Sequence, residues 1–186
     1  MFGWFKKKEH EFKGFKKIPR TEDMVCEITE KLDGTNGVIL IKNRTLVAVG
    51  SRNRWLSAEH DLAAQKDTPG FYSWCYEPER EAWLKQLDDG YYYGEFIGKG
   101  IQRTYDLNHR RFYLFRYDLK EKMENERLGI YTIPHLCTCN LETLESSLRS
   151  SRTVLLLKGS FVNDFEKTEG LVVTMGDRRY KHIWDK

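Results

Sequence analysis

The chain has 186 residues, of which 40% are hydrophobic and 13% aromatic, and this length suits one domain with a substantial core. Lysine and arginine exceed aspartate and glutamate by three, 31 against 28, so charge balance alone neither requires nor excludes a nucleic-acid partner. No apolar run is long enough for a signal peptide or a membrane span, which predicts a soluble, intracellular, cytoplasmic protein.

The first twenty residues interleave basic and aromatic side chains. Such a segment could follow a phosphate backbone and stack on bases, or it could be a solvated terminal segment whose rings pack on the domain. We expect the second arrangement, with residues 1–20 packed on the core. The side chains concerned are Phe2, Trp4, Phe5, Lys6, Lys7, Lys8, Phe12, Lys13, Phe15, Lys16, Lys17 and Arg20.

The next stretch is organised around Glu-Lys-Leu-Asp-Gly-Thr-Asn at residues 30–36. A strand predicted at 24–29 leads into this string, and an apolar run at 38–42 leads out of it. Gly34 and Gly37 allow a sharp turn between the two, because neither carries a Cβ. The spacing therefore predicts two strands joined by a tight connection.

Lys31 lies at the end of the first of these strands, with the carboxylate of Asp33 two positions further on. A free lysine amine has a pKa of about 10.4, and burial or a neighbouring cation lowers that value and makes the amine nucleophilic. Such an amine could attack a phosphorus or a carbonyl. Taken alone, the string is equally compatible with a hairpin turn and a solvated strand lysine.

The rest of the chain reads as many short strands and about three helices. Further strands are predicted at 45–49, 91–96, 111–119, 153–157, 170–174 and 178–183. Helices are predicted at about 57–66, from 77 or 78 to 87, and at 141–149 with Asn140 as its N-cap, while 98–102 is a loop. This pattern predicts an α+β domain dominated by antiparallel strands.

The four cysteines do not form a zinc-site pattern. A lone Cys-x-Cys has no second pair and no suitably spaced histidine, so we expect reduced structural thiols. These residues are Cys26, Cys75, Cys137 and Cys139.

Several charged residues stand at the edges of the predicted strands. Arg179 and Lys181 are two apart, so both point to the same face of an extended segment. Arg52 and Glu95 follow or end apolar strands, and Glu169 opens another. A pocket that collects these groups around Lys31 fits a nucleoside triphosphate and a divalent metal, because cations neutralise phosphate charge and carboxylates hold metal water and ribose hydroxyls.

Six strings in this order resemble the six collinear motifs of the covalent nucleotidyltransferases, the superfamily of ATP-dependent polynucleotide ligases and mRNA capping enzymes. Glu-Lys-Leu-Asp-Gly-Thr-Asn and Gly-Glu-x-x-Gly-x-Gly-Ile-Gln look most like its RNA ligase branch. The resemblance implies an α+β nucleotidyltransferase (ATP-grasp-like ligase) core of antiparallel sheets with flanking helices. The strings are Lys31-Leu-Asp-Gly, Ser51-Arg52, Tyr93-Gly94-Glu95, Phe112-x-x-Phe115-x-Tyr117-Asp118, Glu169-Gly-Leu-Val-Val and Arg179-Tyr-Lys181.

The resemblance implies that Lys31 attacks the α-phosphorus of ATP, releases pyrophosphate and holds AMP as a phosphoramidate. Glu30 is then expected near the adenine edge. Tyr117 is expected to stack on the base, with Phe115 as the alternative if the register differs. Gly34 belongs to the implied nucleotide-binding set, and Asp33 to the catalytic set.

The remaining implied roles concern phosphate, metal and the sealing step. Arg52 and Glu95 contact the ribose or the incoming end. Glu169 positions water on Mg²⁺ or Mn²⁺. Lys181, with Arg179, binds the phosphates and orients the leaving pyrophosphate. Asn36 acts mainly in the later sealing step, where AMP leaves.

Two departures accompany this resemblance. Arg179 stands where most relatives carry lysine, and its planar fork reaches phosphate differently. The chain also stops five residues after Lys181, so we expect residues 21–186 to be a single nucleotidyltransferase domain without a C-terminal OB-fold or helical domain. Substrate grip then comes from the core, the N-terminal segment or a partner chain.

The sequence thus predicts a minimal ATP-dependent RNA ligase, an enzyme with RNA as its partner, including a nicked duplex or an RNA–DNA hybrid. Three alternatives stay open at this point. They are a DNA nick ligase, a GTP-dependent capping-type enzyme, and a nucleic-acid-binding domain without turnover.

Overall fold

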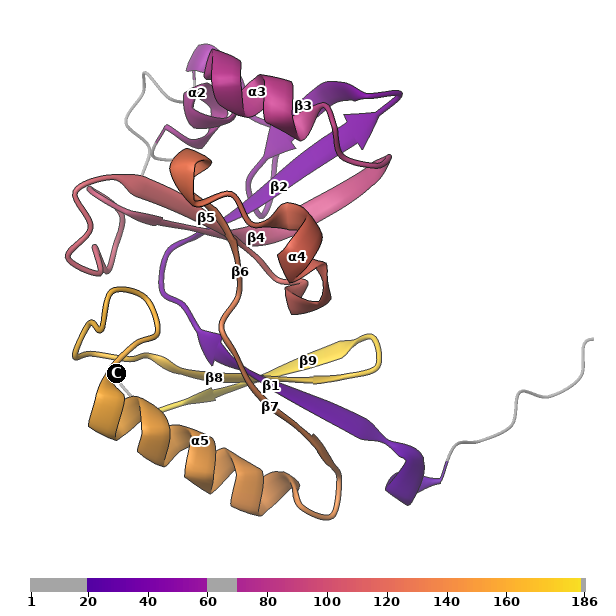
Figure 1. The fold of residues 1–186 in the computed structure, drawn as a ribbon, viewed down its shortest axis with the longest axis vertical. Helices are drawn as coiled ribbons and strands as arrows, with labels where there is room; N and C mark the ends of the chain where they lie inside the picture. Colours follow the sequence, from indigo (N-terminus) through magenta and orange to yellow (C-terminus); the bar gives the residue numbers. More distant parts are fainter. Residues whose placement is uncertain (1–19, 60–69, 185–186) are drawn as a thin grey trace, which may run out of the picture.

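The computed structural model describes residues 20–59 and 70–184, which form two sheets connected by two crossings of the chain (Figure 1). The five-stranded sheet has the order β3-β2-β4-β5-β6, and the four-stranded sheet has the order β7-β1-β8-β9. All neighbouring strands are antiparallel except β5 and β6. The strands are β1 (Val25–Lys31), β2 (Thr35–Lys42), β3 (Thr45–Gly50), β4 (Gly90–Gly98), β5 (Arg110–Leu114), β6 (Ile130–Thr132), β7 (His135–Asn140), β8 (Gly170–Met175) and β9 (Arg178–Ile183).

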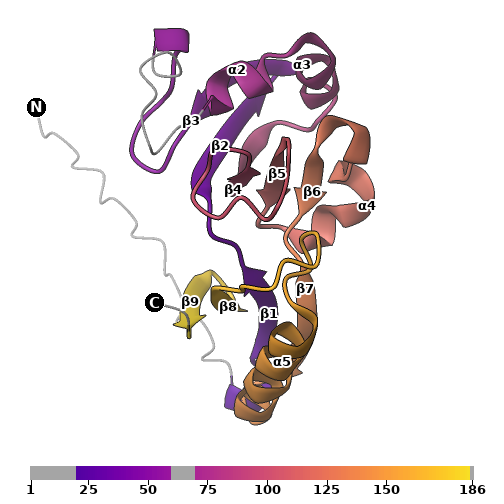
Figure 2. The same cartoon turned by 90° about the vertical axis from the view of Figure 1, so that its left-hand side faces the viewer.

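Helices flank both sheets, which confirms the predicted α+β class. In Figure 2, α5 runs along the four-stranded sheet, while α2 and α3 lie at the opposite end of the molecule beside the five-stranded sheet. Of the helices described, none combines the length and the apolar character that crossing a membrane requires. The α-helices are α2 (Phe71–Cys75), α3 (Pro78–Leu84), α4 (Lys120–Met123) and α5 (Leu144–Lys158), with short 3₁₀ turns at Thr21–Asp23, Tyr117–Leu119 and Glu126–Leu128.

Alternation along β1 decides what the four-stranded sheet buries. Cys26 and Ile28 are fully buried and pack with Leu155 of α5 and Leu171 of β8. The intervening residues of β1 point to the opposite face, because successive side chains of a strand alternate. That face is turned toward the second sheet and carries Lys31 at the strand's end.

The five-stranded sheet is held by a cluster of aromatic rings. Phe71 and Trp74 of α2 pack on Phe96 of β4 and Phe112 of β5, with the Phe71–Phe96 and Phe71–Phe112 ring centroids 4.8 and 5.0 Å apart. Gly37 leaves room for this packing, since a Cβ there would lie 2.6 Å from the Phe71 ring. The cluster therefore covers the face of β2 and β4 that points away from the four-stranded sheet.

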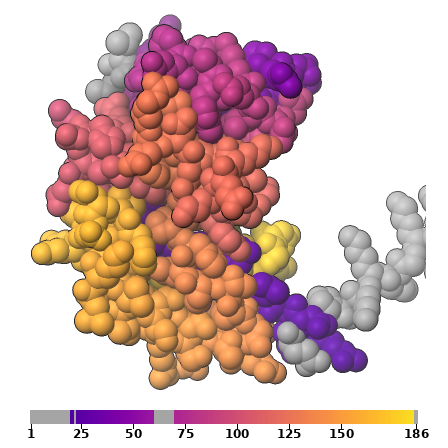
Figure 3. Space-filling view, viewed as in Figure 1, coloured from indigo at the N-terminus to yellow at the C-terminus, as the bar shows by residue number. Residues whose placement is uncertain are grey.

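Two loops, one from each sheet, contact each other on one side of the molecule. The loop after β4 and the loop before β8 lie against each other in the space-filling view (Figure 3). The rings of Tyr105 and Phe165 are 5.3 Å apart, and Asn163 Nδ2 donates to the carbonyl of Tyr105. The fully buried Tyr105 and the buried Leu32 belong to the cluster beneath this contact.

Most of the predicted strands are present, with shifts of a few residues at their ends. Those at 24–29, 38–42, 45–49, 91–96, 170–174 and 178–183 are confirmed, and the helix predicted from 77 or 78 to 87 appears as α3. The strand predicted at 111–119 ends at Leu114 and is followed by a 3₁₀ turn. Four helices and strands were missed: α2, α4, β6 and β7.

The prediction of a strand at 153–157 is wrong, because these residues continue α5. The Thr-Val-Leu-Leu-Leu run has the composition of a strand, but burial follows a helical spacing. Leu155 is fully buried together with Ser151 one turn earlier, whereas Leu156 and Leu157 are 59% and 84% exposed.

The N-cap prediction at residue 140 is also wrong. Asn140 ends β7, and α5 begins only at Leu144. The Asn140 side chain instead accepts hydrogen bonds from the amide and the hydroxyl of Thr143, which closes the turn before the helix. The helix predicted at 57–66 lies mostly outside the described residues, as does nearly all of the N-terminal segment 1–20.

Candidate active site

A cavity of about 760 Å³ lies between the two sheets, a volume within the range of small-molecule sites. Its walls come from the end of β1, the start of β2, the segment after β3, and β4, β8 and β9. The chain passes from β1 to β2 here, so the string at residues 30–36 forms part of the wall.

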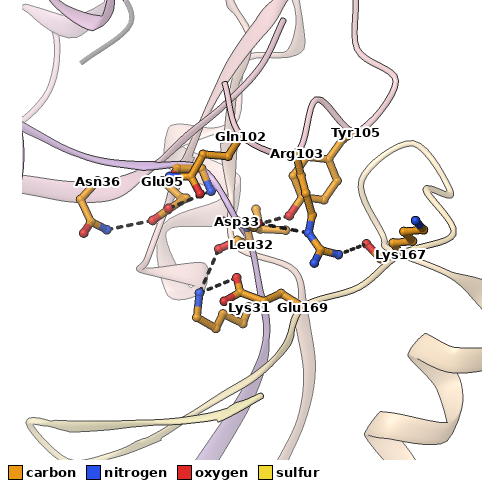
Figure 4. A network of polar contacts seen from close by, with 11 residues as sticks. Lys31, Leu32, Asp33, Asn36, Glu95, Gln102, Arg103, Tyr105, Lys167 and Glu169 are labelled. Carbon is orange, nitrogen blue, oxygen red and sulfur yellow. Dashed lines mark hydrogen bonds and ion pairs between the residues drawn. The ribbon is translucent and has the colours of Figure 1, made fainter. Parts of the chain in front are cut away.

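Lys31 projects from the last position of β1 into this cleft (Figure 4). Its Nζ donates to Glu169 Oε2 at 2.6 Å and, at 3.5 Å, to the carbonyl oxygen of Leu32. The side chains of Lys31 and Glu169 are 23% and 16% exposed, so the pair is partly shielded from water. The structure therefore joins two charged residues that are 138 positions apart in the sequence.

The turn after Lys31 is held by Glu95 from β4. The amide of Gly34 donates to Glu95 Oε1 at 3.1 Å, and Asn36 Nδ2 donates to Glu95 Oε2 at 2.8 Å. Arg52 Nε in turn donates to Asn36 Oδ1 at 3.0 Å. Burial raises the pKa of Glu95 to about 7, and the hydrogen bond from Gly34 opposes that rise. Glu95, Asn36 and Arg52 thus form one connected polar network on the wall of the cleft.

Gly34 requires the absence of a side chain. A Cβ there would lie 2.4 Å from the carbonyl oxygen of Phe96 and 2.5 Å from Ile97 Cγ2. Gln102 Nε2 donates to the Gly34 carbonyl at 2.7 Å, so both polar groups of this peptide have partners. The glycine therefore lets the turn pack directly on β4.

Asp33 is fixed from the loop after β4. Arg103 Nε lies 3.1 Å from Asp33 Oδ2, and the Tyr105 hydroxyl accepts the Asp33 amide at 2.7 Å. Arg103 also donates to the carbonyl of Lys167 at 2.8 Å, which ties this loop to the segment before Glu169. Arg103 and Tyr105 were not predicted as site residues, because they follow the predicted loop at 98–102 and belong to no motif of the sequence.

Glu30 is fully buried at the base of the cleft. Its Oε2 accepts the amide of Phe161 at 2.9 Å, whereas Oε1 has no hydrogen-bond partner among the described residues. Burial raises the pKa of Glu30 to about 7, and hydrogen bonds from Ser160 and Phe161 oppose the rise. A buried oxygen without a partner next to a cavity fits a ligand that brings its own donor.

The opposite wall carries two cations from β9. Arg179 and Lys181 lie opposite Thr174 and Val172 of β8, and all four line the cavity. The Arg179 guanidinium lies 5.0 Å from the centroid of the Phe115 ring, and burial lowers the pKa of Arg179. Cations and apolar groups therefore share this wall.

Of the two aromatic residues considered for base stacking, only Phe115 lines the cavity. The Tyr117 hydroxyl donates to Glu27 Oε1 at 2.9 Å, and its ring stacks on His135 with centroids 4.1 Å apart. The structure thus places Tyr117 beside Glu27 of β1 and His135 of β7, outside the lining of the cavity.

The other predicted site residues gather around the cleft. Glu169 is connected to the cleft by its ion pair with Lys31, which lines the cavity. Val172 and Thr174, which the sequence analysis did not single out, could have been found from alternation along Gly-Leu-Val-Val-Thr, which puts them opposite the buried Leu171 and Val173. The predicted residues that line the cavity are Glu30, Lys31, Asp33, Gly34, Asn36, Arg52, Glu95, Arg179 and Lys181.

Within the described ranges, no three or more histidine, cysteine, aspartate or glutamate side chains cluster closely enough to hold a metal ion. A divalent cation at this site would need oxygens from a substrate as well. Mg²⁺ commonly binds in this way, through one or two carboxylates plus phosphates and water.

The family model for RNA ligase matches residues 25–183 of the chain. No match was found among curated proteins. The chain also resembles solved structures of the Naegleria gruberi RNA ligase. The structure with PPi has a TM-score of 0.63 at 22% identity, and a mutant with ATP and Mn has a TM-score of 0.62 at 23% identity.

Each of these matches covers 88% of this chain and 50% of the Naegleria chain. A further mutant of the same ligase, with AMP and Mn, gives a TM-score of 0.61 at 22% identity. The chain therefore spans about half the length of the solved structures that it matches, and at this identity the likeness concerns the fold.

Proposed function

Because the chain belongs to the RNA ligase family, we propose that it is an ATP-dependent RNA ligase that joins a 5′-phosphate to a 3′-hydroxyl. The observation that carries this proposal is the position of Lys31, whose amine enters a cleft lined by Arg52, Arg179 and Lys181. An amine placed among other cations and carboxylates suits attack on a phosphorus of a bound triphosphate. The Naegleria structures with ATP, AMP and PPi support the choice of nucleotide.

The nucleotide base lies between Phe115 and Val172, with its edge toward Glu30. Phe115 and Val172 supply apolar surface from two different sheets, and both line the cavity. The unpartnered Oε1 of Glu30 accepts a hydrogen bond from the exocyclic amine of adenine. A guanine presents a carbonyl oxygen at the corresponding position, so this contact favours ATP over GTP. Arg52 and Glu95 lie on the wall where the ribose is held.

In the first step Lys31 Nζ attacks the α-phosphorus of ATP. A P–N bond forms, the bond from the α-phosphorus to the oxygen that bridges to the β-phosphorus breaks, and pyrophosphate leaves with that electron pair. The amine needs a free lone pair, so before attack it gives up its contact with Glu169 at 2.6 Å and passes one proton to water. A second proton leaves the nitrogen for water as the P–N bond forms. Arg179 and Lys181 neutralise the charge that develops on the leaving phosphates.

Two further transfers complete the proposed reaction. An oxygen of the RNA 5′-phosphate attacks the phosphorus of lysyl-AMP, which breaks the P–N bond and returns the electron pair and a proton to Lys31. The RNA 3′-hydroxyl then attacks the 5′-phosphate phosphorus, loses its proton and releases AMP. Asn36, held between Glu95 and Arg52, is positioned to orient this second phosphate.

Glu169 is the residue that fits a divalent metal. Its carboxylate is partly exposed at the cleft and exchanges its Lys31 contact on nucleotide binding. Mg²⁺ or Mn²⁺ bound there supplies charge neutralisation at the phosphates. We also propose that residues 21–186 act as one nucleotidyltransferase domain, and that RNA is bound in part by the N-terminal segment or by a partner chain.

The proposal is tested by incubating the protein with ATP labelled at the α-phosphate and Mg²⁺, followed by denaturing electrophoresis. The wild type is expected to retain the label on the chain, and Lys31→Ala is expected to lose it entirely. Lys85→Ala serves as the matched control, because Lys85 pairs with Glu81 on α3, outside the cleft. Equal labelling of Lys31→Ala and the wild type refutes the mechanism, and comparison of 5′-phosphorylated RNA with DNA of the same sequence, each tested single-stranded and nicked, identifies the polynucleotide.

A further inference from the structure

Exposed aromatic rings occupy the open face of the five-stranded sheet beyond the cleft. Alternation along β4 puts Tyr91, Tyr93 and Glu95 on one face. Tyr92 and Phe96 point to the other face and pack with the core under α2. Tyr91 and Tyr93 are 57% and 54% exposed, and their rings stack with centroids 6.1 Å apart and 13° between their planes. The adenylation chemistry above uses neither ring.

The register of the sheet makes these rings a continuation of the active site. Glu95 lies opposite Asn36, and both line the cleft. Two residues back along β4, Tyr93 lies opposite Val38 on the same face. Because residues two apart in a strand are separated by about 6.6 Å, Tyr93 lies directly next to the cleft wall.

A third ring and the proposed stacking residue flank Tyr93 in the same row. Trp55 covers Gly50, since a Cβ on Gly50 would lie 2.9 Å from Trp55 Cε3, and Gly50 is paired with Val38. Trp55 is 49% exposed. On the other side, the amide of Phe115 donates to the carbonyl of Tyr93 at 2.9 Å. The row therefore runs from Trp55 across Tyr93 to Phe115 in the cleft.

The cations at this border suit a polyanion. Arg52 reaches from the segment after β3 to Asn36, three residues before Trp55 in the sequence. Arg179 lies over Phe115 at the other end of the row. A strand of nucleic acid along this row thus meets aromatic faces beneath its bases and guanidinium groups beside its phosphates.

We propose that this open face, formed by Trp55, Tyr91 and Tyr93, binds about two or three unpaired bases of the RNA strand whose end enters the cleft. Aromatic rings on an open sheet stack on bases of any sequence, since every base has a π-face. Paired bases within a duplex cover those faces with their own neighbours. The substrate is therefore single-stranded next to the joined end, and this inference rests on the proposed ligase function.

Binding of a labelled, 5′-phosphorylated single-stranded RNA, measured by fluorescence anisotropy, tests the proposal with the full chain. Tyr93→Ala and Trp55→Ala are each expected to weaken binding about 5- to 100-fold, as loss of a base-stacking ring does. Tyr93→Phe keeps the ring and is expected to bind as the wild type. Leu157→Ala, at an apolar side chain on α5 that is more exposed than either ring, serves as the control.

Formation of lysyl-AMP without RNA is measured in parallel on every variant. The amount of lysyl-AMP is expected to be unchanged in Tyr93→Ala and Trp55→Ala. Absence of lysyl-AMP in the wild type would refute the proposed function, whereas the RNA-binding measurement would still test the inference about the open face. The inference is overturned if Tyr93→Ala binds single-stranded RNA as tightly as the wild type, or loses affinity equally for a blunt duplex. A change of oligomeric state without a change in RNA binding also overturns it, because the face then contacts protein.

Discussion

Replacing the buried carboxyl of Glu30 by an amide is expected to change how stability depends on pH. Glu30 is fully buried, and its pKa rises from 4.5 to about 7, which corresponds to about 3 kcal/mol. Below pH 4.5 the group is protonated in both the folded and the unfolded chain and costs nothing. As pH rises from 4.5 to the folded pKa of about 7, the unfolded chain releases this proton more readily than the folded chain, so the free energy of unfolding falls.

Glu30→Gln removes this loss and keeps an oxygen that accepts the Phe161 amide. Its new NH₂ group takes the place of the unpartnered Oε1, which adds a cost that does not depend on pH. The free energy of unfolding of Glu30→Gln minus that of the wild type is therefore expected to increase by about 3 kcal/mol between pH 4.5 and pH 8. The sign of this change is independent of the constant cost.

Urea denaturation followed by circular dichroism at a series of pH values measures the difference directly. Glu79→Gln provides the matched control, since the Glu79 side chain is 69% exposed and pairs with the similarly exposed Arg127 on the surface. A difference between Glu30→Gln and the wild type that stays constant with pH would refute the reasoning about the buried carboxyl.

Two further predictions concern packing. Gly34→Ala places a methyl group 2.4 Å from the Phe96 carbonyl oxygen, so we expect a loss of about 1–3 kcal/mol in thermal or urea unfolding together with weaker lysyl-AMP labelling; unchanged stability would contradict the observed close approach. Leu155→Ala on α5 is expected to cost about 2–5 kcal/mol because the side chain is fully buried, whereas Leu157→Ala, 84% exposed, is expected to stay within about 0.5 kcal/mol of the wild type. Equal effects of the two substitutions would argue that residues 153–157 do not form the helix described here.

The sequence was sufficient wherever the signal was local. Short runs with strand composition, bounded by turn residues, predicted β1, β2, β3, β8 and β9 within a few residues, because apolar and β-branched residues favour strands. Alternation placed Arg179 and Lys181 on one face of β9, where both line the cavity. Local signals failed at 153–157, where a run of apolar residues is compatible with either helix or strand until the surface that buries it is known.

Other features depended on contacts between distant segments. Phe115 and Tyr117 are two residues apart and equally aromatic, and only the end of β5 at Leu114 and the turn that follows decide that Phe115 enters the cleft. The sheet register decides which of the two rings enters the cleft, and no sequence pattern around either residue predicts that register.

The order of the motifs and the chemistry of their side chains were determined by the sequence alone, since both are properties of the chain as written. The tertiary structure decided which of these groups meet. Lys31 contacts Glu169 because β8 pairs with β1 so that Gly170 lies opposite Lys31, and the loop before β8 is held by Arg103 and Tyr105. A pairing of that kind depends on strand register and loop packing across more than a hundred residues, and no local periodicity encodes it.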